Sequence, residues 1–215
     1  MTLRVLSIAS EAAPLIKTGG LADVAGALPA ALAPHGVEMT TILPGYPKVL
    51  AALGKARAVH GWPSLLGEPA RLLKGTLGAH PLLVVDAPAF FARDGGPYAD
   101  GGGRDWGDNW RRFGAFARAA ADVARGAVKA LAFDLAHAHD WQAAMTPAYL
   151  RYDGSSLPSV MTIHNMAFQG HFGAEIFAGL GLPREAFAFD GVEYHGGVGF
   201  LKAGLEAASA ITTVS

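Results

Sequence analysis

Short apolar runs alternate with a stretch of helical periodicity at the beginning of the chain. Leu3–Ala9 is short, apolar and followed by a turn-rich loop, which is typical of a buried strand. Ala22–Ala33 has apolar positions at helical spacing, although Pro29 is expected to kink or shorten this helix. Val37–Leu43 is a second apolar run. This order predicts a βαβ unit and therefore a parallel pair of strands.

The middle of the chain is predicted to form a strand meander, a loop and a long helix. Strand-like segments separated by turns are Ala56–His60, Ala70–Leu77 and Pro81–Val85. Asp94–Asp108 is rich in glycine and aspartate, which predicts a loop whose length favours mobility or a binding role. From Asn109 to about Leu131, apolar residues recur at helical spacing and predict a long helix.

The last part of the chain continues the alternation of strands and helices. It contains predicted strands at Asp134–Ala138, Pro158–Ile163 and Ala210–Val214, and predicted helices at Gln142–Tyr152 and Phe200–Ala208. The whole pattern predicts an α/β fold with a doubly wound, mainly parallel sheet, formed by a single domain over residues 1–215. In such sheets ligands bind outside the carboxyl ends of the strands, where the strand order reverses.

Composition and charge narrow the classes of protein. The chain is 51% hydrophobic and 16% charged, which favours a folded protein with a sizeable core. Its net charge of −1 gives no broad footprint for nucleic acid or an anionic membrane, and no apolar stretch is long enough for a membrane span. No signal peptide is visible, and the absence of cysteine fits a reducing compartment. We therefore expect a cytoplasmic protein.

A glycine loop joins the first predicted strand to the first predicted helix. Gly19 and Gly20 let the backbone approach a ligand closely, and the amino terminus of the next helix favours an anion. Lys17 adds a positive charge beside them. The loop matches neither G-x-G-x-x-G nor G-x-x-x-x-G-K-S/T, so a nicotinamide or ATP site is not supported. A tight turn without a ligand is the alternative interpretation of the same residues.

The segment from His137 to Trp141 follows the strand predicted at Asp134–Ala138. Its two histidines, His137 and His139, are predicted to point to opposite faces of the strand, which argues against a two-histidine metal pair. Asp140 is predicted either to cap the following helix or to contact a ligand. Because no further nitrogen or oxygen ligand stands at a recognisable spacing, we predict no metal site.

Other polar residues also follow predicted strands or lie in predicted loops. His164 and Asn165 end the strand Pro158–Ile163, where the histidine is either a hydrogen-bonded core residue or a ligand for a substrate hydroxyl. Glu11 follows the first strand and can form an ion pair with Lys17. Tyr98 lies in the long loop and is either a packing aromatic or a binding residue.

These motifs occur together in one order along the chain. They are Ser10-Glu11, Lys17-Thr18-Gly19-Gly20-Leu21-Ala22-Asp23-Val24, Leu43-Pro44-Gly45-Tyr46-Pro47, Pro97-Tyr98, His137-Ala138-His139-Asp140-Trp141, Thr162-Ile163-His164-Asn165-Met166-Ala167-Phe168-Gln169-Gly170 and Phe200-Leu201-Lys202-Ala203-Gly204. In these motifs the chain resembles the amino-terminal half of bacterial glycogen synthase, and it is similar to plant starch synthase. The resemblance spans essentially the whole chain.

The resemblance implies a two-domain GT-B glycosyltransferase, in which two Rossmann-like halves face each other across a cleft. Such enzymes transfer glucose from ADP-glucose to the non-reducing end of an α-1,4-glucan, with retention of the anomeric configuration and without a cofactor or essential metal. Asp140 and His164 are the implied catalytic residues, the first near the glucose and the acceptor and the second on the glucose 6-hydroxyl. The implied substrate-binding residues are Lys17 on the sugar nucleotide, Gly19 and Gly20 against the diphosphate and glucose, Glu11 and Asp23 in the cleft, Tyr98 on the acceptor side and Asn165 beside His164.

The resemblance also implies a missing partner for this chain. Members of the family continue into a carboxy-terminal nucleotide-binding domain that the sequence does not include, so we expect the chain alone to transfer no glucose. Two alternatives are a non-catalytic glucan-binding module and a related GT-B transferase with another nucleotide-sugar donor. Protection of the Lys17 loop by ADP or ADP-glucose distinguishes a donor site from a glucan-binding module.

Overall fold

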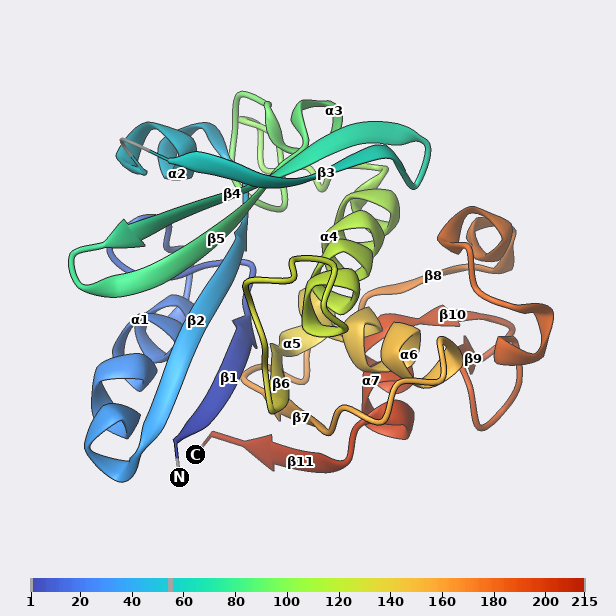
Figure 1. The fold of residues 1–215 in the computed structure, drawn as a ribbon. Coiled ribbons are helices and arrows are strands. Elements are labelled where there is room, and N and C mark those ends of the chain that lie inside the picture. Colours follow the sequence, from blue (N-terminus) through green and yellow to red (C-terminus); the bar gives the residue numbers. More distant parts are fainter. Residues whose placement is uncertain (1, 54–55, 215) are drawn as a thin grey trace.

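The computed structural model describes residues 2–53 and 56–214, which form one large sheet, one small sheet and flanking helices (Figure 1). The large sheet contains β1 (Leu3–Ile8), β2 (Val37–Pro44), β3 (Arg57–Leu65), β4 (Glu68–Leu77), β5 (His80–Asp86), β6 (Leu135–His139), β7 (Ser159–Ile163) and β11 (Ala210–Thr213). The small sheet contains β8 (His171–Gly173), β9 (Glu193–Tyr194) and β10 (Gly197–Gly199). The α-helices are α1 (Gly20–Leu32), α2 (Pro47–Ala52), α3 (Pro88–Phe91), α4 (Asn109–Ala124), α5 (Asp140–Ala143), α6 (Met145–Tyr152) and α7 (Phe200–Ala207). The 3-10 helices are η1 (Ala33–His35), η2 (Ala174–Leu180) and η3 (Arg184–Ala186).

The strand order of the large sheet is β11-β7-β6-β1-β2-β5-β4-β3. Strands β11 to β5 in this order are parallel, whereas β4 and β3 are antiparallel additions at one edge. The chain runs from β1 toward β2 and later from β6 toward β11, so its direction across the sheet reverses between β1 and β6. This confirms the predicted doubly wound α/β class and places the expected ligand crevice at the carboxyl ends of these two strands.

Helices cover both sides of the parallel strands. Figure 1 shows α1 on one side of β1 and β2, and the group from α4 to α7 on the other. Helix α4 is buried almost all round, with Phe113 and Phe116 fully inside the core. In the described part of the chain, no helix is both long and apolar enough to span a bilayer.

Three helix predictions are corrected by the structure. Helix α4 ends at Ala124 rather than near Leu131, because Gly126 adopts a positive φ of 97° just beyond its last turn. The single helix predicted for Gln142–Tyr152 is two short helices, α5 and α6, that meet at Ala144. Helix α1 continues past Pro29 to Leu32.

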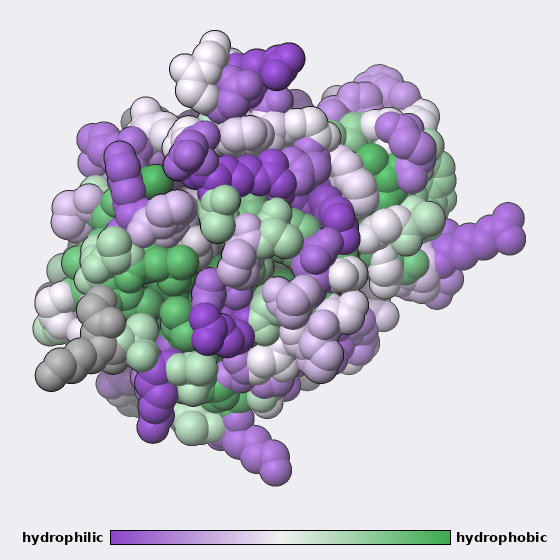
Figure 2. Space-filling view, turned by 90° about the horizontal axis from the view of Figure 1, so that it is seen from above, coloured by the Kyte–Doolittle hydropathy of each residue, from purple (hydrophilic) through white to green (hydrophobic). Residues whose placement is uncertain are grey.

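The antiparallel edge agrees with the predicted meander. Strands β3, β4 and β5 follow one another along the chain and pair as neighbours in the sheet. Many residues of β3 are exposed, since this strand lies at the sheet edge. Figure 2, seen from above, shows hydrophilic and hydrophobic side chains interspersed over the face on which β3, β4 and α3 lie in Figure 1.

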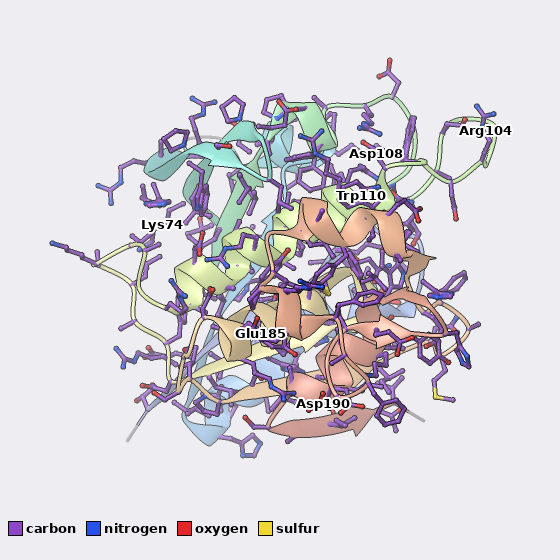
Figure 3. All side chains as sticks on the ribbon, turned by 90° about the vertical axis from the view of Figure 1, so that its right-hand side faces the viewer. Lys74, Arg104, Asp108, Trp110, Glu185 and Asp190 are labelled. Atoms are coloured by element: carbon purple, nitrogen blue, oxygen red, sulfur yellow. The ribbon has the colours of Figure 1, made fainter. Side chains whose placement is uncertain are left out.

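The predicted loop between Asp94 and Asp108 is confirmed, and its base is braced by a buried arginine. Arg112 of α4 donates to the carbonyl oxygens of Phe90 at 2.7 Å and Pro97 at 2.9 Å. The loop extends away from the body of the protein, with Arg104 at its tip (Figure 3). The brace holds the part of the loop that carries Tyr98, while the tip is exposed.

Candidate functional site at the reversal of strand order

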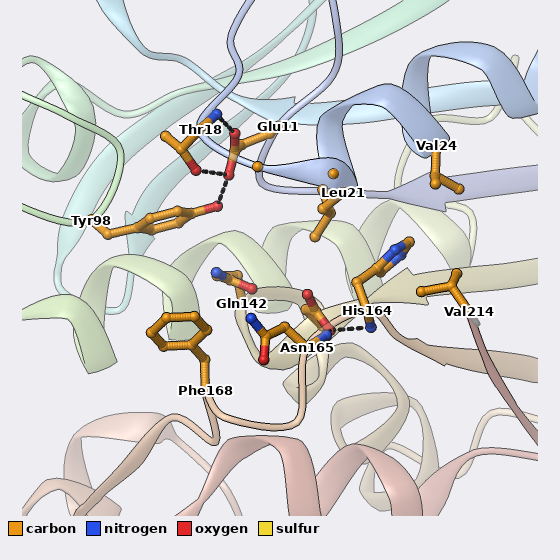
Figure 4. A pocket seen from close by; sticks show the side chains of 13 residues that line it. Glu11, Thr18, Leu21, Val24, Tyr98, Gln142, His164, Asn165, Phe168 and Val214 are labelled. Atoms are coloured by element: carbon orange, nitrogen blue, oxygen red, sulfur yellow. Dashed lines mark hydrogen bonds between the residues drawn. The ribbon is translucent and has the colours of Figure 1, made fainter.

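A pocket of about 400 Å³ lies where the carboxyl ends of β1 and β6 meet the amino terminus of α1 (Figure 4). It is lined by Glu11, Thr18, Gly19, Gly20, Leu21, Val24, Tyr98, Asp140, Gln142, His164, Asn165, Phe168 and Val214. These residues come from five separate parts of the chain. They meet because parallel strands bring their carboxyl ends to the same edge of the sheet.

Seven of the nine residues predicted for the site line this pocket. They are Glu11, Gly19, Gly20, Tyr98, Asp140, His164 and Asn165. The other two, Lys17 and Asp23, are not among the lining residues. The two bind each other, with Lys17 Nζ 2.8 and 2.7 Å from the carboxylate oxygens of Asp23.

Glu11 does not pair with Lys17, which corrects one prediction. Its side chain is buried, and one carboxylate oxygen accepts hydrogen bonds from the Thr18 hydroxyl at 2.7 Å and from the Tyr98 hydroxyl. The other oxygen accepts from the backbone N–H of Thr18. The Tyr98 hydroxyl also lies 2.8 Å from Ser10 Oγ. A buried carboxylate needs such donors, and here they tie the glycine loop to the long loop.

The Lys17–Asp23 pair is open to solvent. The two side chains keep 52% and 57% of their surface exposed, so the pair contributes about 0–1 kcal/mol to stability. Because solvent screens this contact, the ammonium can exchange Asp23 for another anion at little cost.

The two glycines of the loop are not required by its backbone. Gly19 has an extended φ of −147°, and a Cβ added to Gly19 or Gly20 would meet nothing within 4 Å. Gly26 is the opposite case, since its Cβ would lie 2.6 Å from the Ala13 carbonyl oxygen. Packing therefore explains why position 26 needs a glycine, but it does not explain Gly19 or Gly20. These two glycines leave open space at the wall of the pocket.

Asp140 joins the ends of two strands rather than capping a helix. Its Oδ1 accepts the backbone N–H groups of His164 at 2.7 Å and Asn165 at 3.3 Å, and α5 begins at Asp140 itself, with His139 in the N-cap position. The residue is buried and has a positive φ of 55°. Burial raises the pKa of Asp140, while the two backbone donors and the charge of His164 act in the opposite direction.

The two histidines of β6 lie on the same side of the strand, so the prediction of opposite faces is wrong. Their ring centroids are 4.1 Å apart, because residues two positions apart in a strand share a face. His137 Nε2 lies 2.6 Å from the Thr162 hydroxyl. Burial, with a smaller contribution from His164, lowers the pKa of His137 to about 4.

His139 connects the core to the pocket. It is fully buried, with Nδ1 2.9 Å from His164 Nε2 and Nε2 3.3 Å from Ser7 Oγ. Burial, then His137 and His164, lower the pKa of His139 well below its ordinary value. Burial lowers the pKa of His164, and the charge of Asp140 opposes this. His164 Nε2 is therefore already paired with His139, and a ligand in the pocket can use only the other ring nitrogen of His164.

Gln142 is a further pocket residue, which no sequence motif had indicated. It is 6% exposed, lines the pocket and has no hydrogen-bond partner for Oε1 among the described residues. Figure 4 shows its amide together with Tyr98 and Asn165 around the pocket. Its position two residues after Asp140 was the available signal, since the first turn after a strand lies at the same sheet edge.

Within the described ranges, no group of three or more histidine, cysteine, aspartate or glutamate residues is arranged to hold a metal ion. In the histidine cluster, His139 Nδ1 lies 2.9 Å from His164 Nε2, so these two nitrogens face each other. The absence of a metal from the reaction remains a prediction.

A doubly wound sheet with a polar pocket at its reversal point, a helix amino terminus on one wall and strand-end Asp and His on the other defines a class of protein. This is the class of doubly wound α/β domains that bind a ligand at the carboxyl ends of their strands. The chain belongs to the family of the starch synthase catalytic domain, whose family model matches residues 4–215.

Individual relatives agree with this membership. The chain is 74% identical to a glycogen synthase of Novosphingobium aromaticivorans over 100% of its own length and 45% of that protein. It is 56% identical to a glycogen synthase of Mesorhizobium japonicum, covering 99% of this chain and 44% of that protein. It thus spans about half the length of the curated relatives it matches, and corresponds to their amino-terminal part.

A solved structure shows the same fold. The catalytic domain of starch synthase IV from Arabidopsis thaliana, bound to ADP and acarbose, superposes with a TM-score of 0.81 at 27% identity. The match covers 100% of this chain and 45% of that one. The expected GT-B type of fold and the glycogen or starch synthase family are therefore confirmed.

Proposed function

We propose that this chain supplies one wall of the cleft in a glucosyltransferase that uses ADP-glucose and extends an α-1,4-glucan. The observation that carries the proposal is the pocket itself, which joins the amino terminus of α1 to Asp140, His164 and Asn165. The similarity to a starch synthase structure that contains ADP and acarbose supports this choice of donor and acceptor class.

The donor diphosphate is proposed to lie at the glycine loop. The first turn of α1 begins at Gly20 without a side-chain cap, so its N–H groups are available to an anion. Gly19 and Gly20 leave the space that a phosphate needs. Lys17 can turn from Asp23 to the anion. Fixed positive groups there would stabilise the negative charge that develops on the leaving diphosphate.

The glucosyl unit is proposed to lie between the glycine loop and the ends of β6 and β7. Asp140 and His164 are the proposed catalytic residues, because they are the titratable groups at those strand ends that line the pocket. Tyr98, which also lines the pocket, is proposed to contact the acceptor, and Asn165 is proposed to bind the sugar beside His164. Holding the sugar and excluding water around its oxocarbenium-like transition state are the expected contributions of this wall.

The proposed reaction needs a second wall. The matched relatives are about twice as long as this chain, so a carboxy-terminal domain is proposed to complete the donor site. Residues 1–215 are proposed to form the single amino-terminal domain. No cofactor or metal is proposed, and the activity belongs to the two parts together.

A chimera tests the proposal. This chain would replace the matching amino-terminal part of the Novosphingobium glycogen synthase, to which it is 74% identical. Incorporation of radiolabelled glucose from ADP-glucose into glycogen is expected for the chimera and not for the 215-residue chain. Asp140→Asn and His164→Ala should each reduce turnover about 100-fold or more without loss of folding. A folded chimera that transfers no glucose, or variants with normal turnover, would refute it.

Nucleotide binding by the chain alone distinguishes the donor site from a glucan-binding module. Hydrogen exchange in the loop around Gly19 and Gly20 should slow when ADP is added. Gly20→Ala should reduce this protection while leaving the melting temperature unchanged, because its Cβ meets no protein atom. Glycogen binding with no effect of ADP would favour the module.

A further inference from the structure

A chain of hydrogen bonds runs across three neighbouring strands and ends at the pocket. Ser7 lies on β1, His139 on β6, and His164 directly follows β7. Ser7 Oγ is 3.3 Å from His139 Nε2, and His139 Nδ1 is 2.9 Å from His164 Nε2. Ser7 is 1% exposed and His139 is 0% exposed, whereas His164 is half-buried and lines the pocket.

Counting hydrogen-bond donors shows which group donates in each hydrogen bond of this chain. A neutral histidine carries one N–H, and a serine carries one O–H. If Ser7 donates to His139 Nε2, then His139 Nδ1–H donates to His164 Nε2, and every buried hydrogen has an acceptor. In the reverse direction His139 donates to Ser7, whose own O–H has no acceptor among the described residues. A buried unpaired donor loses its full hydration, so the first direction is favoured.

We infer that Ser7 and His139 are positioning residues that hold His164 as the tautomer with its proton on Nδ1. His164 Nε2 then accepts from His139, and Nδ1–H is the hydrogen-bond donor left for a ligand. The ligand atom that His164 recognises is therefore a hydrogen-bond acceptor. Its identity as an oxygen of the glucosyl unit rests on the proposed function, whereas the tautomer does not.

The surroundings of His139 keep it in the neutral form that this arrangement requires. Burial and the neighbouring His137 and His164 lower its pKa well below the ordinary value. His137 stacks on His139 with ring centroids 4.1 Å apart, but its own Nε2 bonds the Thr162 hydroxyl. His137 therefore contacts His139 without being part of the hydrogen-bond chain. A substitution of His137 is a matched control for a substitution of His139.

Long-range nitrogen–proton NMR of the histidine rings in the 215-residue protein reads the tautomer directly. Near neutral pH we expect His164 and His139 each to have a protonated Nδ1 and an unprotonated Nε2. A spectrum in which His164 Nε2 carries the proton would overturn the inference. This measurement uses the unmodified chain and no substrate, so it stands whether or not the protein transfers glucose.

Three variants test the positioning role. His139→Phe removes the donor, His139→Asn keeps an N–H near the Nδ1 position, and His137→Phe is the control. We expect His139→Phe to let His164 populate both tautomers, while the other two retain the wild-type signal. In the chimera, His139→Phe should lower kcat about tenfold or more with little change in KM for the donor, and His139→Asn should recover most of it.

Two results would contradict the positioning role. One is a His139→Phe variant with the wild-type His164 tautomer and kcat. The other is an equal loss in His137→Phe, which would indicate damage to packing. If His139→Phe does not fold, His139→Asn and the wild-type spectrum still decide whether the hydrogen bonds run from Ser7 through His139 to His164. A chimera without any transfer would refute the proposed function and leave the NMR result unaffected.

Discussion

Replacing Tyr98 by phenylalanine tests whether its hydroxyl braces the pocket or contacts a ligand. The hydroxyl donates to Glu11, so Ser10 Oγ, at 2.8 Å, donates to it in turn. A hydrogen bond to a charged group contributes about 1.5–3 kcal/mol. Glu11 keeps both donors of Thr18, but the fully buried Ser10 hydroxyl loses its acceptor, which adds about 1 kcal/mol. We expect Tyr98→Phe to lower the free energy of unfolding by about 3 kcal/mol.

For a chain of this length, such a loss corresponds to a decrease in Tm of about 6–12 °C. Thermal and urea unfolding at neutral pH, followed by circular dichroism, measure it. Tyr152→Phe is the control, because that hydroxyl has no hydrogen bond to a described residue and its loss should change stability by less than about 0.5 kcal/mol. A double-mutant cycle with Glu11→Gln should give a coupling of about 1–2 kcal/mol. Wild-type stability of Tyr98→Phe combined with loss of glucan binding would show that the hydroxyl is a ligand contact and that the brace is wrong.

Three further predictions concern the pocket and its surroundings. Gln142→Met should raise the free energy of unfolding by about 1 kcal/mol, since it removes a buried oxygen without a partner, and should weaken sugar binding; a lower Tm would contradict this. The pKa of His137 falls from 6.5 to about 4 on folding, so His137 stays neutral in the native state while it binds a proton in the unfolded state. Its contribution to the free energy of unfolding should therefore fall by about 3 kcal/mol as the pH decreases from 6.5 to 4. Urea titrations at several pH values measure this dependence. The free energy of unfolding should change less steeply with pH in His137→Asn than in the wild type, and an unchanged pH dependence would exclude His137 as its cause. Gly26→Ala should destabilise the fold by about 1–3 kcal/mol, despite the higher helix propensity of alanine, because its Cβ would meet the Ala13 carbonyl; Gly20→Ala, with open space, should melt like the wild type.

Hydrophobic periodicity was sufficient to predict most of the fold. Each strand predicted for the large sheet is present within a few residues, and the parallel pairing of β1 with β2 follows from the predicted βαβ order. This succeeded because a strand buried on both faces must be a short apolar run, and a crossover helix must be amphipathic. The end of α4 was missed because Ala127 and Leu131 continue the apolar spacing beyond Gly126, where the backbone leaves the helix.

Most residues that line the pocket could be predicted, because they directly follow predicted parallel strands. The hydrogen bonds between these residues could not be predicted. Glu11, Asp140 and His164 follow β1, β6 and β7, and strands that run in parallel bring such residues together. Which donor reaches which carboxylate depends on loops distant in sequence. Tyr98 reaches Glu11 across 87 positions, and Lys17 turns to Asp23 instead.

The sequence by itself determined the class of fold, the edge of the sheet at which the site lies and the family to which the chain belongs. These depend on periodicity and on motifs that are local along the chain. The tertiary structure alone decided that Asp140 accepts the N–H groups of His164 and Asn165, and that a buried serine and histidine lie behind His164. Hydrogen bonds are directional and short, so their partners are set by the placement of whole strands in space rather than by the order of residues.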